Sequence, residues 1–115
     1  MAASYRDISG PVTVLTTFIA KHEFVEKVAQ YMSDDIDNQR RLAKEGKLPG
    51  LIFIEGVRFG DSFASWEKYV DADAVDKVVL LRVKSVKDAS IAEGFVVPPN
   101  FQFFGTDSLP PPTKQ

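Results

Sequence analysis

The sequence of 115 residues predicts an α+β fold of six elements in the order strand, helix, strand, strand, helix, strand. Three observations predict this order. Short runs rich in β-branched and aromatic residues are typical of strands, and two longer stretches have the three-to-four apolar spacing of amphipathic helices. Glycine or proline marks most of the junctions. The length fits one domain, expected over residues 1–107, followed by a Pro-rich tail over residues 108–115.

The first strand is expected over Val12–Ala20, directly after the turn-forming Gly10-Pro11. Apolar side chains occupy both of its faces, which suits a strand buried on both sides. A helix is expected from about His22 to Lys44, because apolar residues recur there every three or four positions. Gly46 is expected to cap the end of this helix, and Leu48-Pro49-Gly50 then turns the chain.

Leu51–Phe59 and Ser62–Val70 are expected to form a hairpin, because only Gly60-Asp61 separates these two strand-like runs. Both faces of the first of these strands carry apolar residues. If helices cover one face of the sheet, the other face exposes an apolar patch of a kind that monomers avoid. We therefore expect two sheets to pack face to face in a homodimer. The alternative is a monomer with an apolar sheet face.

Asp71 stands at the N-cap position of a second helix that begins at Ala72. The alternative is a strand over Lys77–Val86, which is rich in β-branched residues, but the cap and the acidic first turn favour the helix. The final strand is expected over Phe101–Gly105. This βαββαβ order is typical of the ferredoxin-like arrangement, in which two helices pack on one face of a four-stranded antiparallel sheet.

The composition excludes several kinds of site. There is no cysteine, so disulfides, thiolate zinc sites and iron–sulfur clusters are absent, and His22 is the single histidine. The net charge of −2 comes without a basic stripe, which argues against nucleic-acid binding. No apolar run approaches the length of a membrane span, and the first ten residues do not form a signal peptide. We expect a soluble cytoplasmic protein with no metal and no cofactor.

A resemblance to a known family adds to this prediction. The sequence is similar to the antibiotic biosynthesis monooxygenase-like family of the dimeric α+β barrel superfamily, over about residues 11–106. The similarity is carried by a Pro-Gly turn before the second strand and by spaced residues around the end of the third strand: Pro49, Gly50, Glu67, Tyr69, Asp73, Ala74 and Val75. It implies a homodimer whose two sheets form a barrel, with a pocket in each subunit between sheet and helices.

The resemblance also has consequences for activity. Haem-degrading members of the family carry an Asn where Thr16 stands and a histidine on the second helix, but no histidine follows His22 here. Tyr69 replaces the family's usual Trp. The resemblance thus implies a cofactor-independent monooxygenase of anthrone or quinol type, acting on a small aromatic or polyketide-like substrate. The alternatives are a polyketide cyclase or isomerase, and a non-catalytic ligand-binding or assembly protein.

Three residues are catalytic candidates. Tyr69 shares a strand face with Phe63 and Glu67, and its phenol is expected to hydrogen-bond the substrate; the alternative is an aromatic at the core edge. Glu67 lies in the middle of a strand and needs a partner, for which Arg58 is the cross-strand candidate. The alternative role for Glu67 is that of a general base. His22 is expected at the surface. The alternative is that His22 acts as a general base at the mouth of the pocket.

The remaining candidates would bind the substrate. Thr16 would donate a hydrogen bond inward from the first strand; the alternative is that it is simply a residue type common in strands. Trp66 is expected on the opposite strand face, packing against the partner, with a role in the pocket as the alternative. An aromatic lining suited to a flat polycyclic molecule is expected from Phe18, Phe53, Phe63 and Tyr69.

Overall fold

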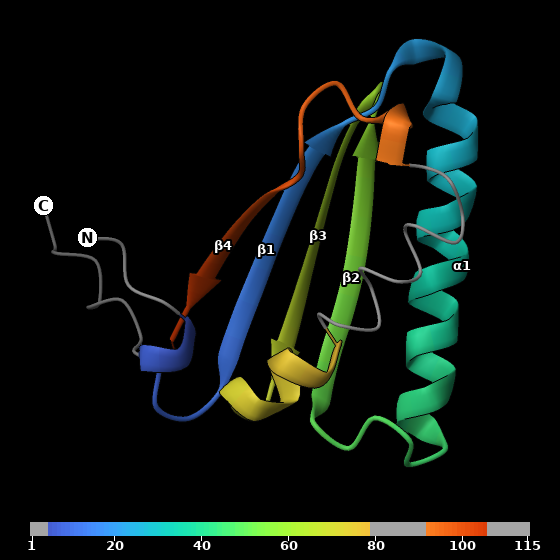
Figure 1. Cartoon of the computed structure of the whole chain (residues 1–115). Helices are drawn as coiled ribbons and strands as arrows, with labels where there is room; N and C mark the ends of the chain where they lie inside the picture. The colour runs from blue at the N-terminus through green and yellow to red at the C-terminus, as the bar shows by residue number, and fades with distance from the viewer. Residues whose placement is uncertain (1–4, 79–91, 106–115) are drawn as a thin grey trace, which may run out of the picture.

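The computed structural model of the chain describes residues 5–78 and 92–105. Its four strands form one antiparallel sheet in the order β2-β3-β1-β4. Their bounds are Val12–Ile19 (β1), Leu51–Phe59 (β2), Ser62–Tyr69 (β3) and Asn100–Phe104 (β4). A long helix, α1 (Val25–Lys44), lies beside β2 along one face of the sheet (Figure 1). The predicted ferredoxin-like α+β fold is confirmed.

The first helix is confirmed with a different start. A 3-10 turn, η2 (His22–Phe24), precedes α1, so the regular helix begins three residues later than predicted. Its end follows the prediction. Gly46 has a positive φ of 78°, and the N–H of Lys47 donates to the carbonyl of Leu42 at 2.8 Å. The left-handed conformation of Gly46 allows the N–H groups at the end of the helix to pair with its last carbonyls. It also turns the chain toward β2.

The hairpin and the start of the second helix are also confirmed. β2 has the predicted bounds, and Gly60 adopts a positive φ of 61° in the connecting turn. The side chain of Asp71 accepts a hydrogen bond from the N–H of Ala74 at 2.9 Å, as an N-cap does, and residues 72–78 are helical. Most of the stretch Lys77–Val86 and the tail over residues 108–115 lie outside the described residues.

The two sheet faces differ in what covers them. The face toward α1 carries the alternate, mostly buried residues of β1 and β3, namely Val12, Val14, Thr16, Phe18, Phe63, Ser65, Glu67 and Tyr69. The opposite face, which we call the uncovered face, is not covered by any described element. It exposes large apolar side chains: Ile19, Phe53, Val57, Phe59 and Phe104. The apolar residues on both faces of the second strand predicted an exposed apolar face of this kind.

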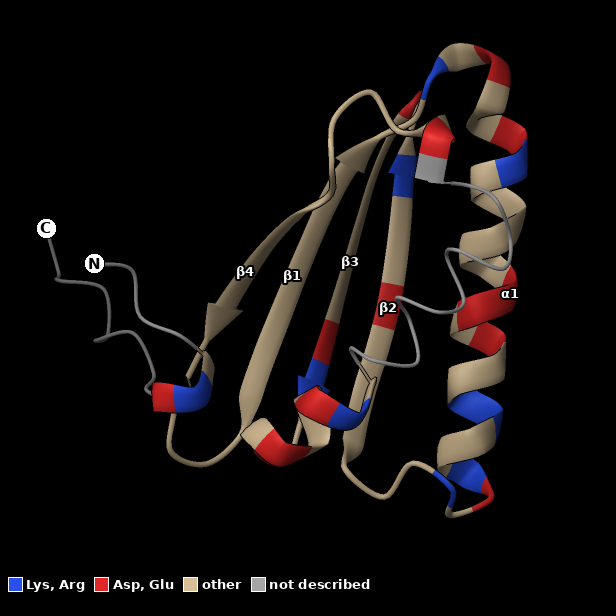
Figure 2. Cartoon of the chain, viewed as in Figure 1, with Lys and Arg blue, Asp and Glu red and all other residues tan. Residues whose placement is uncertain are grey.

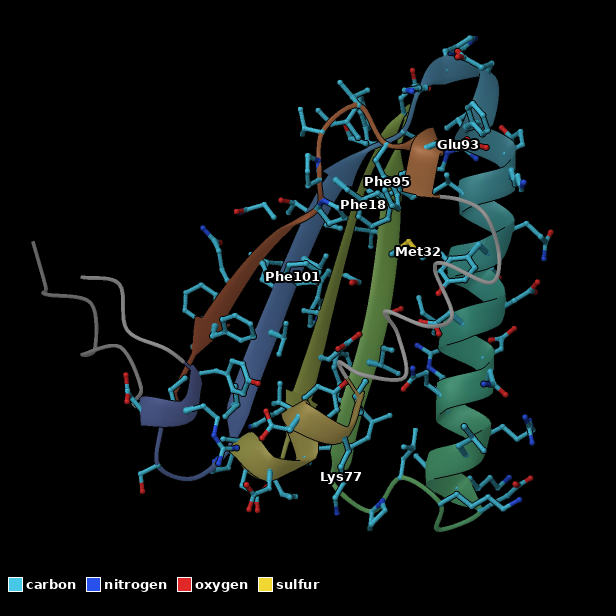
Figure 3. All side chains as sticks on the ribbon, in the orientation of Figure 1. Phe18, Met32, Lys77, Glu93, Phe95 and Phe101 are labelled. Carbon is cyan, nitrogen blue, oxygen red and sulfur yellow. The ribbon has the colours of Figure 1, made fainter. Side chains whose placement is uncertain are left out.

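A glycine sets how closely α1 approaches the sheet. A Cβ atom on Gly56 would lie 2.6 Å from Ile36 Cδ1 and 2.7 Å from Met32 Cε, so these two helix side chains fill the space above the glycine. Figure 3 shows Met32 between α1 and the sheet. At one end of the helix, Arg58 of β2 pairs with Glu26 at 2.8 Å. The helix is thus held to β2 by apolar packing and by an ion pair at its first turn.

Charged residues are concentrated on the helix. Figure 2 shows both signs of charge along α1, whereas the strands are mostly uncharged. β1 and β4 carry no charged residue at all. Within the described part of the chain, no helix is long and apolar enough to cross a membrane.

Candidate functional site

The candidate site lies at the centre of the sheet face that turns toward α1. The strand register places three residue rows across β1 and β3 there: Phe18 opposite Phe63, Thr16 opposite Ser65, and Val14 opposite Glu67. The middle row continues into Gly56 of β2. Small side chains therefore occupy this row on β1, β3 and β2, and Phe101 of β4 lies beyond Thr16 at its other end. Aromatic rings lie on one side of the row and a carboxylate on the other.

The polar side of this site is a buried pair. The hydroxyl of Tyr69 donates a hydrogen bond to Glu67 Oε2 at 2.7 Å, and the two side chains are only 1% and 3% exposed. They come together because residues two apart on a strand point to the same face. An ionised carboxylate offers only acceptor oxygens, so a fixed phenol donor holds it in one orientation.

The predicted partner of Glu67 was wrong. Arg58 does not lie opposite Glu67; it lies opposite Phe63, with its guanidinium 5.7 Å from the ring centre. The guanidinium pairs instead with Glu26, and it holds the pKa of the Glu26 carboxyl below its usual range through hydrogen bonding and charge. The residue opposite Glu67 on β2 is Ile54.

The apolar side of the site is a group of aromatic rings. Phe18 and Phe63 stack with ring centres 5.1 Å apart and planes inclined by only 11°. Phe95 packs edge-on against Phe18, also at 5.1 Å. Figure 3 shows Phe18 and Phe95 together near one end of the sheet, away from Lys77 at the other end. Phe63 is 4% exposed and belongs to a core cluster with Val25 and Val28 of α1, against which Phe18 and Phe95 pack.

The structure separates the predicted site residues into two groups and one outlier. Thr16, Phe18, Phe63, Glu67 and Tyr69 share the face toward α1. By contrast, Trp66 and Phe53 belong to the uncovered face. Trp66 alternates with its neighbours on β3, and Phe53 is placed there by an irregularity in β2, where the register shifts between Leu51 and Phe53.

His22 is the outlier. Its side chain is 89% exposed, and its Nδ1 lies 3.4 Å from Asp61 Oδ2. Asp61 is next to the start of β3, whereas Glu67 is six positions further along, which corresponds to about 20 Å in a strand. The structure thus places His22 at the surface, far from the buried pair.

One buried polar residue was not identified from the sequence. Gln39 of α1 is 6% exposed, and among the described residues it joins Thr16 and Glu67 as a buried polar side chain. Its Nε2 lies 3.4 Å from Asp35 Oδ1. Its Oε1 is enclosed and has no hydrogen-bond partner within the described part of the chain. The available signal was its spacing, because Gln39 continues the three-to-four repeat of Val28, Met32 and Ile36.

Two hollows open on the surface near these elements. A groove of about 260 Å³ runs between α1 and β2 and is lined by residues that include Met32, Ile36, Arg40 and Gly56. A more apolar hollow of about 490 Å³ lies at the hairpin end of the sheet, between residues such as Phe59 and Val97. The described residues contain no cluster of three or more acidic or histidine side chains suited to a metal ion.

Comparison with known proteins supports the fold. No family model and no curated protein matches the chain in sequence. Among solved structures, an antibiotic biosynthesis monooxygenase matches with a TM-score of 0.66 at 13% identity, covering 86% of this chain and 99% of that one. A Nitrosomonas europaea protein of unknown function matches with a TM-score of 0.67 at 15% identity, covering 91% and 97%.

A third solved structure, Rv0793 from Mycobacterium tuberculosis, matches with a TM-score of 0.65 at 14% identity, covering 86% of this chain and 97% of that one. At these identities the matches concern the arrangement of helices and strands, and they extend over nearly the whole length of each solved chain. The resemblance stated from the sequence is confirmed at this level: the chain has the fold of the antibiotic biosynthesis monooxygenase-like structures.

Proposed function

We propose that the chain is an enzyme that removes a proton from a small aromatic or polyketide-like substrate, with Glu67 as the base. The observation that supports this proposal is the buried pair of Glu67 and Tyr69, joined at 2.7 Å on the face toward α1. A buried carboxylate needs hydrogen-bonding partners, of which the Tyr69 hydroxyl is one, and buried ionisable groups are common at sites of chemistry. The phenol of Tyr69 orients the carboxylate for proton transfer.

The surroundings of the pair favour a flat, apolar substrate. Phe18 and Phe63 stack into a wall on one side of the middle row, and Thr16 supplies a hydroxyl within that row. Because Thr16 and Ser65 are small, a ring packed against the aromatic wall would have its edge directed toward Glu67. Binding in this position would hold an acidic C–H near the base and exclude water from it.

The reaction that this arrangement supports best is a cofactor-independent oxygenation. Glu67 takes one proton from a CH₂ group that is conjugated to a carbonyl, as in an anthrone, and an enolate forms. The enolate gives one electron to O₂, and the resulting substrate radical and superoxide combine into a C–O–O bond. Reprotonation yields a hydroperoxide, which loses water and leaves a carbonyl, so that CH₂ and O₂ become C=O and H₂O. The fold shared with an antibiotic biosynthesis monooxygenase supports this reaction.

A polyketide cyclase or isomerase would use the same first step. In that case the enolate attacks a carbonyl of the same molecule or takes the proton back at another carbon, and no O₂ is consumed. The two reactions therefore differ after proton removal, while the role of Glu67 is common to both. A non-catalytic ligand-binding or assembly protein would bind through the same aromatic wall without either reaction.

We also propose that the functional unit is a homodimer. The uncovered face exposes Val57 and Phe53 to 51% and 43%, and Phe59 at its end is 90% exposed. Large contiguous apolar patches are rare on monomers. Packing two such faces around a twofold axis would bury these side chains and place the face toward α1 of each chain on the outside of the sheet pair.

The proposal is tested by measuring oxygen uptake and product formation together, with anthrone and with a naphthalene quinol as substrates. We expect the wild type to consume one O₂ per anthraquinone formed, and Glu67→Gln to lower the rate by about 100-fold to 10,000-fold. Glu23→Gln, at an exposed position of η2, serves as the matched control. Product without O₂ uptake would indicate a cyclase or isomerase, and binding without any product a non-catalytic protein.

A further inference from the structure

A short turn near the N-terminus bridges the β4 edge of the sheet and the helix of residues 72–78. This turn is η1 (Tyr5–Asp7), and the N–H of Ile8 donates to the carbonyl of Tyr5 at 3.1 Å, which closes it. Figure 1 shows η1 beside the end of β4, at the same end of the sheet as the helical residues 72–78 in yellow. We call residues 5–8 the N-terminal strap.

The strap contacts β4 through apolar side chains. The Tyr5 ring packs on Phe103 with ring centres 4.8 Å apart and planes inclined by 41°. Ile8 lies at the end of the same strand, since its Cγ2 would be 3.4 Å from a Cβ on Gly105. Tyr5, Ile8 and Phe103 all pack against the core cluster that contains Tyr69. The strap therefore covers the β4 side of the core in which the buried pair lies.

Polar contacts hold the same strap to the helix of residues 72–78. The Tyr5 hydroxyl donates a hydrogen bond to Asp76. Arg6 Nη1 lies 3.0 Å from Asp73 Oδ1 and 2.6 Å from Asp76 Oδ2. The side chains of Arg6, Asp73 and Asp76 are 49%, 78% and 44% exposed, and exposed ion pairs stabilise a fold only weakly. The polar contacts of the strap therefore break at little cost.

One row of the sheet leads from beneath the strap to Glu67. Phe103 lies opposite Val14, and Val14 lies opposite Glu67. Because neighbouring strands are about 4.8 Å apart, Phe103 is about 10 Å from Glu67 along this row. In the next row, Phe101 on the same face of β4 is 56% exposed, so solvent reaches this side of the sheet. Tyr5 thus covers the solvent end of the Glu67 row.

The other described elements that cover this face are held more strongly. The helix of residues 72–78 buries Val75 and Val78, which are 1% and 4% exposed, and α1 packs closely above Gly56. By contrast, the apolar side chains of the strap, Tyr5 and Ile8, are only half-buried. Separating fully buried apolar side chains costs more free energy than breaking exposed ion pairs. Of the described elements over this face, the strap opens at the lowest cost.

We propose that the N-terminal strap opens and closes the β4 side of the face toward α1, and that Arg6 holds it closed. When Arg6 releases the two aspartates of the helix, Tyr5 leaves Phe103 and the Glu67 row becomes accessible from the β4 edge. This inference rests on the proposed function for the purpose of the opening. Glu67 is 3% exposed, so a substrate reaches it only after a covering element has moved. The opening itself is a property of the fold and is measurable without a substrate.

The absence of cysteine from the sequence makes a direct test possible. Val14→Cys places a single thiol in the Glu67 row beneath the strap, and Val28→Cys places one in the separate core cluster under α1. The rate of modification of each thiol by dithiobis(nitrobenzoic acid) is measured without denaturant and without substrate. Since both positions are buried, this rate reports how often each of them becomes accessible.

We expect Arg6→Gln to raise the modification rate in the Val14→Cys protein about threefold to tenfold, because two exposed ion pairs are lost. The rate in the Val28→Cys protein should stay unchanged. Arg41→Gln removes an exposed ion pair with Glu45 on α1 and is the matched control, which should change neither rate. High sodium chloride should raise the rate in the Val14→Cys protein only while Arg6 is present, because salt screens exposed ion pairs.

Two results would overturn the proposal. Equal acceleration in the Val14→Cys and Val28→Cys proteins would show that Arg6→Gln loosens the whole fold. An unchanged rate in the Val14→Cys protein would show that Arg6 does not hold this side closed. If Val14→Cys does not fold, Val12→Cys, opposite Tyr69 on the same face, takes its place.

The outcomes for the strap and for catalysis are distinguishable. A selective acceleration by Arg6→Gln in a protein that turns over no substrate would support the role of the strap and contradict the proposed reaction. Turnover by the wild type without any acceleration by Arg6→Gln would support the reaction and contradict the role of the strap.

Discussion

The Tyr69 hydroxyl and the Glu67 carboxylate form a 2.7 Å hydrogen bond inside the sheet, between side chains two residues apart on β3. Both side chains are almost fully buried. Their burial depends on the register of β3, because a slip by one residue would move both to the uncovered face. The hairpin turn at Gly60 and the pairing of Val14 with Glu67 fix this register.

Removing the donor of this pair is expected to destabilise the fold. Tyr69→Phe deletes a buried hydrogen bond to a carboxylate, and we expect the free energy of unfolding at neutral pH to fall by about 2 kcal/mol. Urea denaturation followed by fluorescence measures this change. Lys27→Ala, at an exposed position of α1 away from both sheet faces, should change the value by less than about 0.5 kcal/mol. Equal effects of the two substitutions would contradict the structural role of the pair.

Two glycines are expected to differ in their tolerance of a methyl group. A Cβ on Gly50 would lie 2.2 Å from the Cβ of Ala74, which has no flexible side chain to move aside. At Gly56 the obstructing atoms are the ends of Met32 and Ile36, which are able to shift. We expect Gly56→Ala to cost about 1–3 kcal/mol and Gly50→Ala to cost more. Thermal denaturation of both variants ranks them, and the reverse order would be inconsistent with the packing described.

The ion pair at the start of α1 should make part of the stability depend on pH. Arg58 lowers the pKa of Glu26 in the folded state below its ordinary value of 4.5. A carboxyl with a depressed pKa contributes stability above its unfolded pKa, and this contribution disappears as the pH falls through the folded pKa. The difference in stability between wild type and Glu26→Gln should therefore be present at about pH 6 and shrink below about pH 4.

Nuclear magnetic resonance titration of the Glu26 carboxyl tests the cause of this dependence. We expect its pKa to return to the ordinary range in Arg58→Ala, because the guanidinium is the main source of the shift. Glu23, an exposed carboxyl close by in η2, is the internal reference. An unchanged pKa of Glu26 in Arg58→Ala would show that another group causes the shift.

The uncovered face should control the oligomeric state. Light scattering is expected to give a mass of twice 12.8 kDa for the wild type. Val57→Glu places a charge on this face, and we expect it to shift the protein toward the monomer mass. Gln30→Glu adds the same charge on the exposed side of α1 and should leave the mass unchanged. A wild-type mass near 12.8 kDa would contradict the dimer.

The parts of the fold that follow local rules were predictable from the sequence. The bounds of β2, the glycine cap at Gly46 and the N-cap at Asp71 depend on a few neighbouring residues, and the structure confirms all three. Tyr69 lies on the same sheet face as Glu67 because side chains alternate along a strand with a period of two residues. These features need no knowledge of the tertiary arrangement.

The parts that depend on register or on distant packing were not predictable. Arg58 was expected opposite Glu67, but the hairpin register places Ile54 opposite Glu67 and Phe63 opposite Arg58. The register shift near Leu51 places Phe53 on the uncovered face, which simple alternation along the strand does not reveal. Gln39 continues the apolar spacing of α1, but a polar side chain at such a position is usually exposed, and its burial follows from the packing of α1 on the sheet.

Hydrogen exchange at the substrate carbon tests the role of Glu67 most directly. Anthrone is incubated with the protein in D₂O without oxygen, and deuterium uptake at the CH₂ group is followed by mass spectrometry. This measurement isolates proton removal from the steps that need O₂. We predict that the wild type accelerates the exchange and that Glu67→Gln lowers this acceleration by about 100-fold or more. Exchange no faster than in buffer, or equally fast in Glu67→Gln, would contradict the assignment of Glu67 as the base.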